Sequence, residues 1–553
     1  MTLPSAARIL VDQLKAQGVR RVTCVPGESY LAVLDALYES GIEVLSCRNE
    51  GGAAIMAEAQ GKLTGRPGIC FVTRGPGATN ASHGVHIAMQ DSTPMILFVG
   101  QVESGMRERE AFQELDYKAV FGSMAKWVVE IDSAARMAEH IAHAFRVAMQ
   151  GRPGPVVVAL PEDVLVQTAE AVTVPYIEPA RAAPAAEDIA RLQALLSRAE
   201  RPLAIIGGSG WDEGAAGRLA AFAERFDLPV ASSFRRASIF PAGHPNYAGD
   251  LGIGPDPRLK AMVADADLII LIGGRLSEMP SASYTLLDIP VPSQKLVHVH
   301  PGAEELGHVY HPVLAIQAGP IAFTQAMADL RPSARPPWAG RAAQAHADYL
   351  DWSGRPRTLP GDFQFGRIVR ELSDRLPPDT IICNGAGNYA GWLHRHHRFG
   401  AFGSQLAPTS GSMGYGVPAA VIAKAEYPSR TVIAYAGDGC FLMNGQEFAT
   451  AVQYDLPIIV IVVDNGQYGT IRMHQENHYP GRVIATQLSN PDFAAYARAF
   501  GGHGETVRTT GEFFPAFERA VASRRPAILH CFLHPDAQSH ARDFVPPADG
   551  TPQ

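Results

Sequence analysis

The sequence has no long hydrophobic run and few cysteines, and these absences exclude several classes of protein. No apolar run approaches the roughly 18 residues that a membrane-spanning helix needs. The six cysteines are scattered without CxxC spacing, which argues against structural zinc and fits a reducing compartment. A formal net charge of −8 argues against nucleic acid or an anionic membrane as partner. The first residues form a charged amphipathic pattern and not a signal peptide, so we expect a cytoplasmic protein.

The sequence of 553 residues predicts a multidomain α/β enzyme. The length suggests about three to four domains. Short β-branched runs alternate with helical patterns, which predicts parallel sheets. Two segments rich in Pro and Ala, 170–187 and 331–360, are predicted linkers. The expected units are three doubly wound domains and a tail, at 1–165, 187–330, 361–535 and 536–553.

A strand, a tight turn and a helix follow one another from residue 431. The β-branched run at 431–436 predicts a strand, and the Gly-Asp-Gly sequence around Asp438 lets the backbone turn sharply and approach a ligand. Asn444, with Glu447 three residues later, resembles a capping box. This pattern predicts a helix from 444 to 454.

A second turn follows the apolar run at 458–463, which is typical of a strand covered on both faces. Strand, helix and strand joined this tightly form a right-handed crossover, so Asp438 and Asn465 (465 − 438 = 27 positions apart) lie at carboxyl ends of parallel strands. Their oxygens suit Mg²⁺, which takes one or two protein groups together with phosphates. The carbonyl of Gln467 is a further predicted ligand. Either turn alone is more often an ordinary α/β turn.

Together the two turns resemble the motif of the thiamine-diphosphate enzymes, in which an asparagine follows the Gly-Asp-Gly sequence after about 25 to 30 residues. The segments RNEGGAA at 48–54, GPGATN at 75–80 and GYGVPAA at 414–420 match the same family. The chain resembles its acetolactate synthase, pyruvate oxidase and benzoylformate decarboxylase superfamily over nearly all its length, and acetolactate synthase-like proteins most. This resemblance implies a pyrimidine-binding, a central Rossmann-like and a diphosphate-binding domain.

The resemblance also implies the cofactors thiamine diphosphate and Mg²⁺ and the residues that hold them. Glu50 matches the glutamate that hydrogen-bonds the cofactor's aminopyrimidine ring; a glutamate opposing a helix dipole is the alternative. Asp438, Asn465 and Gln467 are the implied metal ligands. The other implied cofactor-binding residues are Gly387, Asn388, Met413, Gly437, Gly439, Cys440 and Tyr468. Because the family pairs domains across subunits, a homodimer or homotetramer with active sites at the interface is expected.

The residues around the substrate agree less well with this family. AFQE at 111–114 resembles an acetolactate synthase segment and implies that Phe112 and Gln113 face the reacting carbon. Lys126 matches a lysine near the substrate entrance, with a solvated surface charge as the alternative. His474 stands where acetolactate synthase has a tryptophan that shapes the second-substrate pocket.

The resemblance implies a lyase or transferase of C–C bonds that acts on a 2-oxo acid or related acyl donor. In acetolactate synthase-like carboligation, CO₂ leaves and the acyl unit passes to an aldehyde or ketone. The alternative is a 2-oxo acid decarboxylase of the benzoylformate decarboxylase type, which releases an aldehyde. FAD is left open: the glycines at 207–210 follow a strand and open a helix, but 275–278 only loosely resembles a flavin-binding segment.

Overall fold

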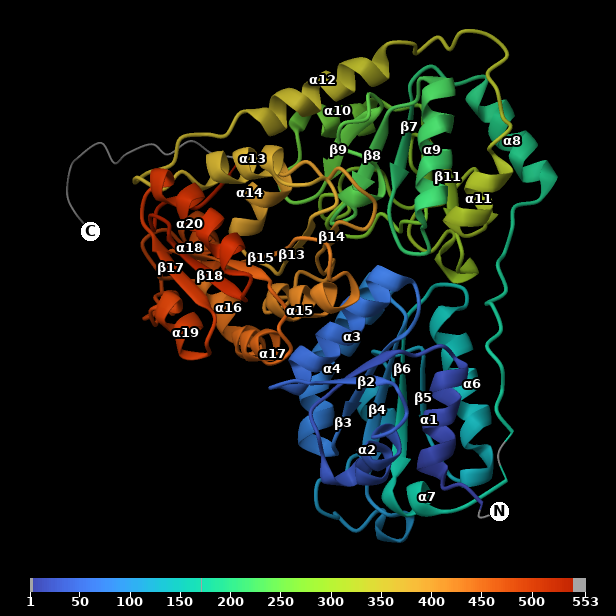
Figure 1. Ribbon diagram of the computed structural model, residues 1–553. Coiled ribbons are helices and arrows are strands. Elements are labelled where there is room, and N and C mark those ends of the chain that lie inside the picture. Colours follow the sequence, from blue (N-terminus) through green and yellow to red (C-terminus); the bar gives the residue numbers. More distant parts are fainter. Residues whose placement is uncertain (1–2, 171, 541–553) are drawn as a thin grey trace.

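The computed structural model describes residues 3–170 and 172–540 (Figure 1). It contains three six-stranded sheets, one after another along the chain, in which neighbouring strands run parallel. Helices cover both faces of each sheet (Figure 1). The prediction of three doubly wound α/β domains is therefore confirmed.

The first sheet has the strand order β2-β1-β3-β4-β6-β5. Its strands are β1 Arg21–Cys24, β2 Glu43–Ser46, β3 Gly68–Val72, β4 Met95–Gln101, β5 Trp127–Glu130 and β6 Pro155–Pro161. Its helices are α1 Ala6–Ala16, α2 Leu31–Leu37, α3 Glu50–Thr64, α4 Gly75–Asp91, α5 Tyr117–Phe121, α6 Met137–Met149 and α7 Glu162–Val166. Every residue of β3, β4 and β6 is buried, which explains their continuous apolar character.

The central sheet has the strand order β12-β11-β10-β7-β8-β9. Its strands are β7 Pro202–Ile206, β8 Val230–Ser233, β9 Tyr247–Leu251, β10 Leu268–Ile272, β11 Lys295–His300 and β12 Leu314–Gln317. Its helices are α8 Ala186–Leu196, α9 Glu213–Phe226, α10 Pro257–Asp265, α11 Pro320–Ala326 and α12 Arg341–Gly354.

Helix α12 lies in the segment 331–360, for which the composition predicts a linker. Ala342, Ala345 and Tyr349 are buried, and they follow one another at helical spacing. Tyr349 meets Tyr247 of β9 edge to face, with ring centroids 4.8 Å apart. The composition did not indicate this helix, because the Pro and Arg content of the whole segment concealed one short apolar stripe.

The third sheet has the strand order β14-β13-β15-β16-β18-β17. Its strands are β13 Ile381–Asn384, β14 Gln405–Leu406, β15 Val432–Gly437, β16 Ile459–Asp464, β17 His503–Val507 and β18 Ala527–Phe532. Its helices are α13 Phe365–Arg375, α14 Tyr389–His396, α15 Gly416–Glu426, α16 Asp438–Asn444, α17 Phe448–Gln453, α18 Gly469–His478, α19 Phe493–Ala499 and α20 Thr510–Ser523.

The helix predicted from 444 to 454 is wrong in its start. Helix α16 begins at Asp438 itself, and a 3₁₀ turn separates it from α17. Asn444 makes no side-chain cap and donates instead to the carbonyl of Gly414. Glu447 accepts hydrogen bonds from the backbone N–H groups of Arg48 and Asn49 in the first domain. A tertiary partner therefore replaces the local cap.

The first domain lies below the central one in Figure 1, and the third lies beside both. Helix α3 packs on α15, so the first and third domains are in contact. The segment 172–185 runs along the outside from α7 to α8 (Figure 1). Of the predicted tail, Gln538 and His540 accept hydrogen bonds from Asn388 and Arg395, and the rest, 541–553, lies outside the described residues.

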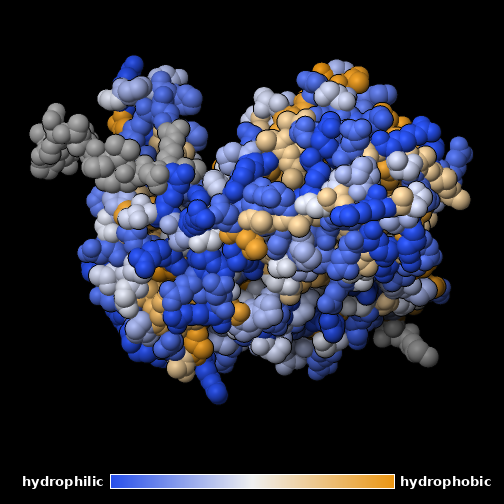
Figure 2. All heavy atoms as spheres, turned by 90° about the horizontal axis from the view of Figure 1, so that it is seen from above, coloured by the Kyte–Doolittle hydropathy of each residue, from blue (hydrophilic) through white to orange (hydrophobic). Residues whose placement is uncertain are grey.

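The surface is mixed in character. Hydrophilic residues cover most of the face in Figure 2, with small scattered hydrophobic patches. Within the described residues, none of the helices is both long and apolar enough to cross a bilayer. All six cysteines are buried and free of disulfide bonds.

Candidate active site

The carboxyl ends of β13, β15 and β16 meet at one edge of the third sheet. The chain order along this sheet reverses between β13 and β15, and such a reversal opens a crevice at the strand ends. Strands β15 and β16 pair with Gly437 opposite Val463. Asp438 and Asn465 follow directly, so the structure brings the two predicted turns together.

Asp438 links these turns. Its side chain is buried, and Oδ2 accepts from the backbone N–H of Gln467 at 3.2 Å and from Nδ2 of Asn490 at 2.8 Å. Burial raises the pKa of Asp438 to about 6, and the nearby carboxylate of Asp464 adds to this shift. A buried carboxylate in such a place gains most from a cation.

Gln467 and Tyr468 continue the second turn. The Gln467 carbonyl accepts from the N–H of Gly469 at 2.9 Å, and a carbonyl keeps a second lone pair. The Gln467 side chain donates to the carbonyl of Pro535 at 2.6 Å. The Tyr468 ring covers Gly439, where an added Cβ would lie 2.5 Å from Tyr468 Cε1. Only glycine permits this close approach.

The other predicted cofactor residues lie on loops beside Asp438. The thiol of Cys440 accepts from the N–H of Gly414 at 3.3 Å, which ties α16 to the loop that carries Met413. Gly387 has a φ of +141°, and a Cβ there would lie 3.0 Å from the ring of Tyr389. Tyr389 also bounds Gly437, at 3.2 Å from its hypothetical Cβ. The loops that carry Gly387, Met413 and Gly437 therefore lie together beside Asp438.

Asn388 has partners within the protein. Its Nδ2 donates to the carbonyl of Gln538 at 2.6 Å, and its Oδ1 accepts from the hydroxyl of Thr470 at 2.9 Å. The residue thus holds α18 and the end of the described chain beside the crevice.

Glu50 lies at another sheet, in the first domain. It is the first residue of α3, after the N-cap Asn49, and its Oε2 accepts from Nδ2 of Asn80 at 3.0 Å. A Cβ on Gly77 would lie 3.4 Å from Glu50 Oε1. The structure thus brings Glu50 and the GPGATN segment together, while it places Asp438 in a separate domain.

The loop with Phe112 and Gln113 begins on the same side of the first domain. The Gln113 carbonyl accepts from the N–H of Gly75 at 3.0 Å, which pins the loop to the start of α4. Gln113 has a left-handed φ of +64°, and Glu108 and Glu110 are left-handed as well. Such backbone strain is concentrated at functional sites. Phe112 is 75% exposed.

The side chain of Lys126 is half-buried and bound by backbone carbonyls. Its Nζ donates to the carbonyls of Val147 and Gln150 at 2.6 and 2.7 Å, at the end of α6. Burial lowers the pKa of Lys126 to about 8. The ammonium therefore satisfies backbone groups that the helix leaves open.

His474 is exposed on α18, where its ring stacks at 6.3 Å on that of His478. Within α18 itself no residue is buried, although Ile471 is apolar and 51% exposed. This helix therefore presents an uncovered surface beside the crevice.

Three further candidate functional residues were not predicted from the sequence: Asp464, Asn490 and His530. Nδ2 of Asn490 donates to Asp464 Oδ1 at 2.9 Å as well as to Asp438, and His530 Nε2 lies 2.8 Å from Asp464 Oδ2. Although burial opposes it, hydrogen bonds from His530 and Gly466 hold the pKa of Asp464 below its usual value. No local pattern marks these residues, since their partners lie 26 and 66 positions away.

The central sheet offers little space for a nucleotide. The glycine turns after β7 and β10 touch: a Cβ on Gly208 would lie 1.7 Å from the carbonyl oxygen of Gly273. Arg236 donates to the Gly208 carbonyl at 2.9 Å and lies across the same crevice. The cavity beside these groups measures about 40 Å³, far below the several hundred Å³, on the order of 300 or more, of a small-molecule site.

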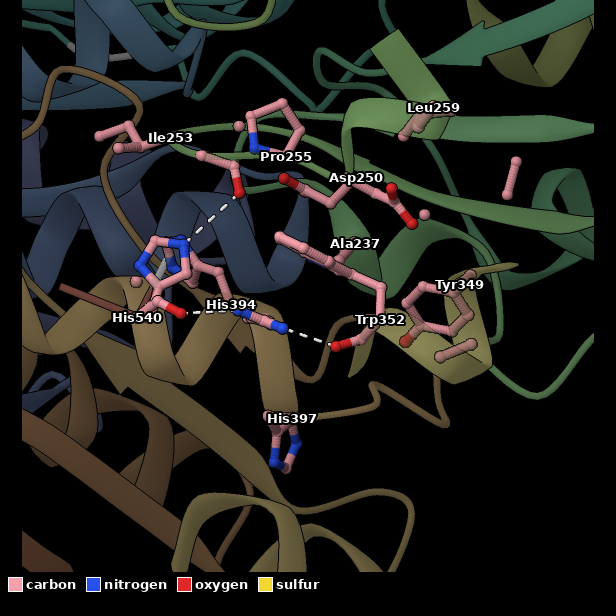
Figure 3. Close-up of a pocket in the computed structure, with 18 of the residues that line it drawn as sticks. Ala237, Asp250, Ile253, Pro255, Leu259, Tyr349, Trp352, His394, His397 and His540 are labelled. Atoms are coloured by element: carbon pink, nitrogen blue, oxygen red, sulfur yellow. Dashed lines mark hydrogen bonds between the residues drawn. The ribbon is translucent and has the colours of Figure 1, made fainter. Parts of the chain in front are cut away.

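Another small cavity separates β9 from α14 (Figure 3). Asp250, His394 and His540 line it, and burial raises the pKa of Asp250 to about 7. His540 closes one side, with its carbonyl bound by Arg395 at 2.6 Å. The lining contains none of the predicted site residues, all of which fall within the described ranges.

Across residues 3–170 and 172–540, His, Cys, Asp and Glu side chains form no cluster of three or more that is able to hold a metal. A cation at Asp438 must therefore draw on amide and carbonyl oxygens and on the ligand's own phosphates. That donor set fits Mg²⁺ and excludes a site like that of zinc.

The chain matches three family models. They are described as the N-terminal TPP binding domain, the central domain and the C-terminal TPP binding domain of thiamine pyrophosphate enzymes, and they match residues 4–120, 189–327 and 385–531.

Curated relatives align over nearly the whole chain. Acetolactate synthase isozyme 2 large subunit of Escherichia coli (strain K12) is 31% identical, with 98% of each chain covered. The acetolactate synthase large subunit of Parasynechococcus marenigrum (strain WH8102) is also 31% identical, over 99% of this chain and 90% of the relative. Acetolactate synthase of Bacillus subtilis (strain 168) is 27% identical, over 95% and 92%.

Proposed function

Because this chain belongs to the thiamine pyrophosphate enzymes, as a thiamine-diphosphate-dependent carboligase similar to acetolactate synthase, we propose that it removes CO₂ from a 2-oxo acid and joins the acyl unit to a carbonyl acceptor. One observation carries this proposal. The hydrogen bond from Gln467 N–H to Asp438 joins the turns after β15 and β16 into one oxygen-rich edge. Such an edge suits a diphosphate and its cation.

Mg²⁺ is the proposed cation. The side-chain oxygens of Asp438 and Asn465 and the carbonyl of Gln467 are its proposed protein ligands. Gly439 supports the fit, because only a glycine there lets the Tyr468 ring of the second turn pack against the first turn. The phosphates would complete the coordination.

Glu50 is the proposed proton carrier. Thiamine diphosphate, when bound, supplies a carbon nucleophile once its aminopyrimidine is correctly protonated. The Asn80 amide donates to one Glu50 oxygen and so orients the carboxyl, while the bare Gly77 leaves space beside the other. The Glu50 carboxyl then exchanges a proton with the ring nitrogen of the pyrimidine.

A homodimer or homotetramer with active sites between protomers is also proposed. Glu50 and Asp438 belong to different domains of one chain, so an interface supplies a way to bring two such halves together. The exposed apolar side chains beside the crevice support a covered surface there. They are Leu442, Met443, Ile471 and Ile484, each 45–74% exposed.

FAD is not part of the proposed enzyme. The contact of Gly208 with Gly273 and the hydrogen bond from Arg236 to Gly208 give no support for a dinucleotide at the central sheet. The cytoplasm stays the proposed location, supported by six unpaired thiols. The proposed domain boundaries are 1–165, 187–330 and 361–535.

A product assay tests the function. The purified chain with Mg²⁺ and thiamine diphosphate is given a panel of 2-oxo acids, alone and with aldehyde or ketone acceptors, and the products are identified by mass spectrometry. A 2-hydroxy ketone product is expected. Free aldehyde in the presence of every acceptor would favour the decarboxylase, and the absence of both cofactor binding and turnover would refute the proposal.

A further inference from the structure

Asn490 occupies an unusual position beside the predicted cation ligands. It lies between α18 and α19, outside both predicted turns. Its Nδ2 donates one hydrogen bond to Asp438 Oδ2 at 2.8 Å and one to Asp464 Oδ1 at 2.9 Å. A carboxylate only accepts hydrogen bonds, so the amide nitrogen must face both carboxylates, and this fixes the orientation of the amide.

The amide oxygen of Asn490 then faces away from the carboxylates. This Oδ1 is enclosed by the fold, and among the described residues no donor reaches it. A buried acceptor without a partner costs free energy, so such a group in a native protein calls for a partner. An ordered water molecule is the partner that this position calls for.

The Asp464–His530 pair holds Asn490 from behind. His530 is buried, and its Nδ1 accepts from the N–H of Phe493 at 3.3 Å. This leaves Nε2 as the donor to Asp464 Oδ2 at 2.8 Å. The other oxygen of Asp464 accepts from Gly466 N–H at 2.9 Å as well as from Asn490. Asp464 therefore orients the turn with Asn465 and the Asn490 amide at once.

We propose that Asn490, oriented by Asp464 and His530, is a positioning residue of the cation site. Its Nδ2 occupies Asp438 Oδ2 together with the Gln467 N–H, which leaves Oδ1 of Asp438 for the cation. The inference rests on the proposed Mg²⁺ and thiamine diphosphate site and extends it beyond the residues that touch the metal.

Mn²⁺ serves as the probe, because electron paramagnetic resonance measures its free concentration without turnover. The full chain is titrated with Mn²⁺ at saturating thiamine diphosphate. Asn490→Ala and His530→Leu should each bind Mn²⁺ about ten- to a hundredfold more weakly than the wild type. His530→Gln keeps an N–H near the place of Nε2 and should stay within about threefold, since only the ring is lost.

Asn246→Ala is the matched control. Asn246 is buried in the central domain, and its Nδ2 also donates two hydrogen bonds, to the carbonyls of Ala223 and Leu228. This variant should melt earlier but bind Mn²⁺ as the wild type does. Circular dichroism verifies folding. If Asn490→Ala does not fold, the His530→Leu and His530→Gln pair decides, because it leaves Asn490 in place.

Unchanged Mn²⁺ affinity in folded Asn490→Ala, or equal affinities of the two His530 variants, would overturn the inference while the proposed function stands. A wild-type chain that binds neither Mn²⁺ nor thiamine diphosphate would refute the proposed function itself. A second readout separates positioning from general damage. Calorimetry with excess Mg²⁺ should return the affinity of Asn490→Ala for thiamine diphosphate to nearly the wild-type value.

Discussion

The cation edge of the third domain and the substrate loop of the first domain are built in opposite ways. Asp438 is 3% exposed and bound by two donors, whereas Phe112 is 75% exposed on a loop held by its backbone. The first region is complete in a single chain. In the second region the chain leaves an apolar side chain uncovered. We propose that the first region serves the cofactor chemistry and the second the choice of substrate.

Removal of Asp438 should break this comparison most severely. In Asp438→Ala the turns after β15 and β16 lose their common acceptor, and the cation loses its only carboxylate among the proposed ligands. We expect Mg²⁺ affinity to fall more than about a hundredfold, beyond the effect of outer-shell changes, and turnover to vanish. Calorimetric titration with thiamine diphosphate and Mg²⁺ measures the loss.

Asp256→Ala is its control, because Asp256 is also buried and also begins a helix, α10. That variant should lose about 1 kcal/mol of unfolding free energy through its helix cap and keep its cofactor affinity. Normal Mg²⁺ binding by Asp438→Ala would show that the third-domain edge is not the cation site.

Glu50→Gln tests the chemistry of the first domain without changing its shape. The amide still accepts from Asn80 but no longer exchanges a proton with the cofactor. We expect kcat to fall about 10²- to 10⁴-fold, the usual contribution of general acid–base catalysis, with thiamine diphosphate affinity nearly unchanged. Steady-state kinetics and calorimetry check both parts. Glu103→Gln, an exposed change in the same domain, should leave kcat as it is.

Phe112→Ala should act on substrate choice more than on rate or stability. Its exposed ring packs little against its own chain, so unfolding free energy should change by less than about 0.5 kcal/mol. Loss of its apolar contact with substrate should raise KM about tenfold, in the range of 1–3 kcal/mol for a hydrophobic contact in a pocket.

The kcat-to-KM split across several 2-oxo acids measures this effect, and Met106→Ala, another exposed change near the loop, is the control. Equal KM values for Phe112→Ala and the wild type with every acid would remove Phe112 from the substrate site.

Local features of the structure were predictable from the sequence, and long-range contacts were not. Buried strands such as β16 showed as apolar runs, because both faces of a parallel sheet are covered. The two turns with Asp438 and Asn465 were predictable because a short crossover constrains where their strand ends lie. Their partners were not, since Asn490 reaches Asp438 across 52 positions. Such contacts depend on the folded loops and leave no period in the sequence.

Glu447 and α12 show the two ways in which local patterns failed. Glu447 fitted a capping box with Asn444, but the backbone of Arg48, 399 positions away, provided better donors in a buried contact. In α12 the average composition pointed to a linker, and only the spacing of Ala342 and Ala345 marked the helix. Burial in the folded chain determined both the partner of Glu447 and the formation of α12. Neither the average composition nor the neighbouring residues indicate such burial.

Lys126→Met should have the smallest effect on activity, because Nζ is held by Val147 and Gln150 at the end of α6. We expect kcat/KM to be unchanged in this variant. Lys118→Met, an exposed substitution nearby, is the matched control. A more than tenfold loss of kcat/KM would instead indicate that Lys126 lies near the substrate entrance.

The stability that Lys126 contributes to the folded chain should depend on pH. Burial lowers the pKa of Lys126 from 10.5 to about 8 in the folded chain, so between these values the unfolded chain binds more protons. The wild type therefore gains stability relative to Lys126→Met as pH rises from about 8 to 10.5, and Tm measured across this range checks the sign.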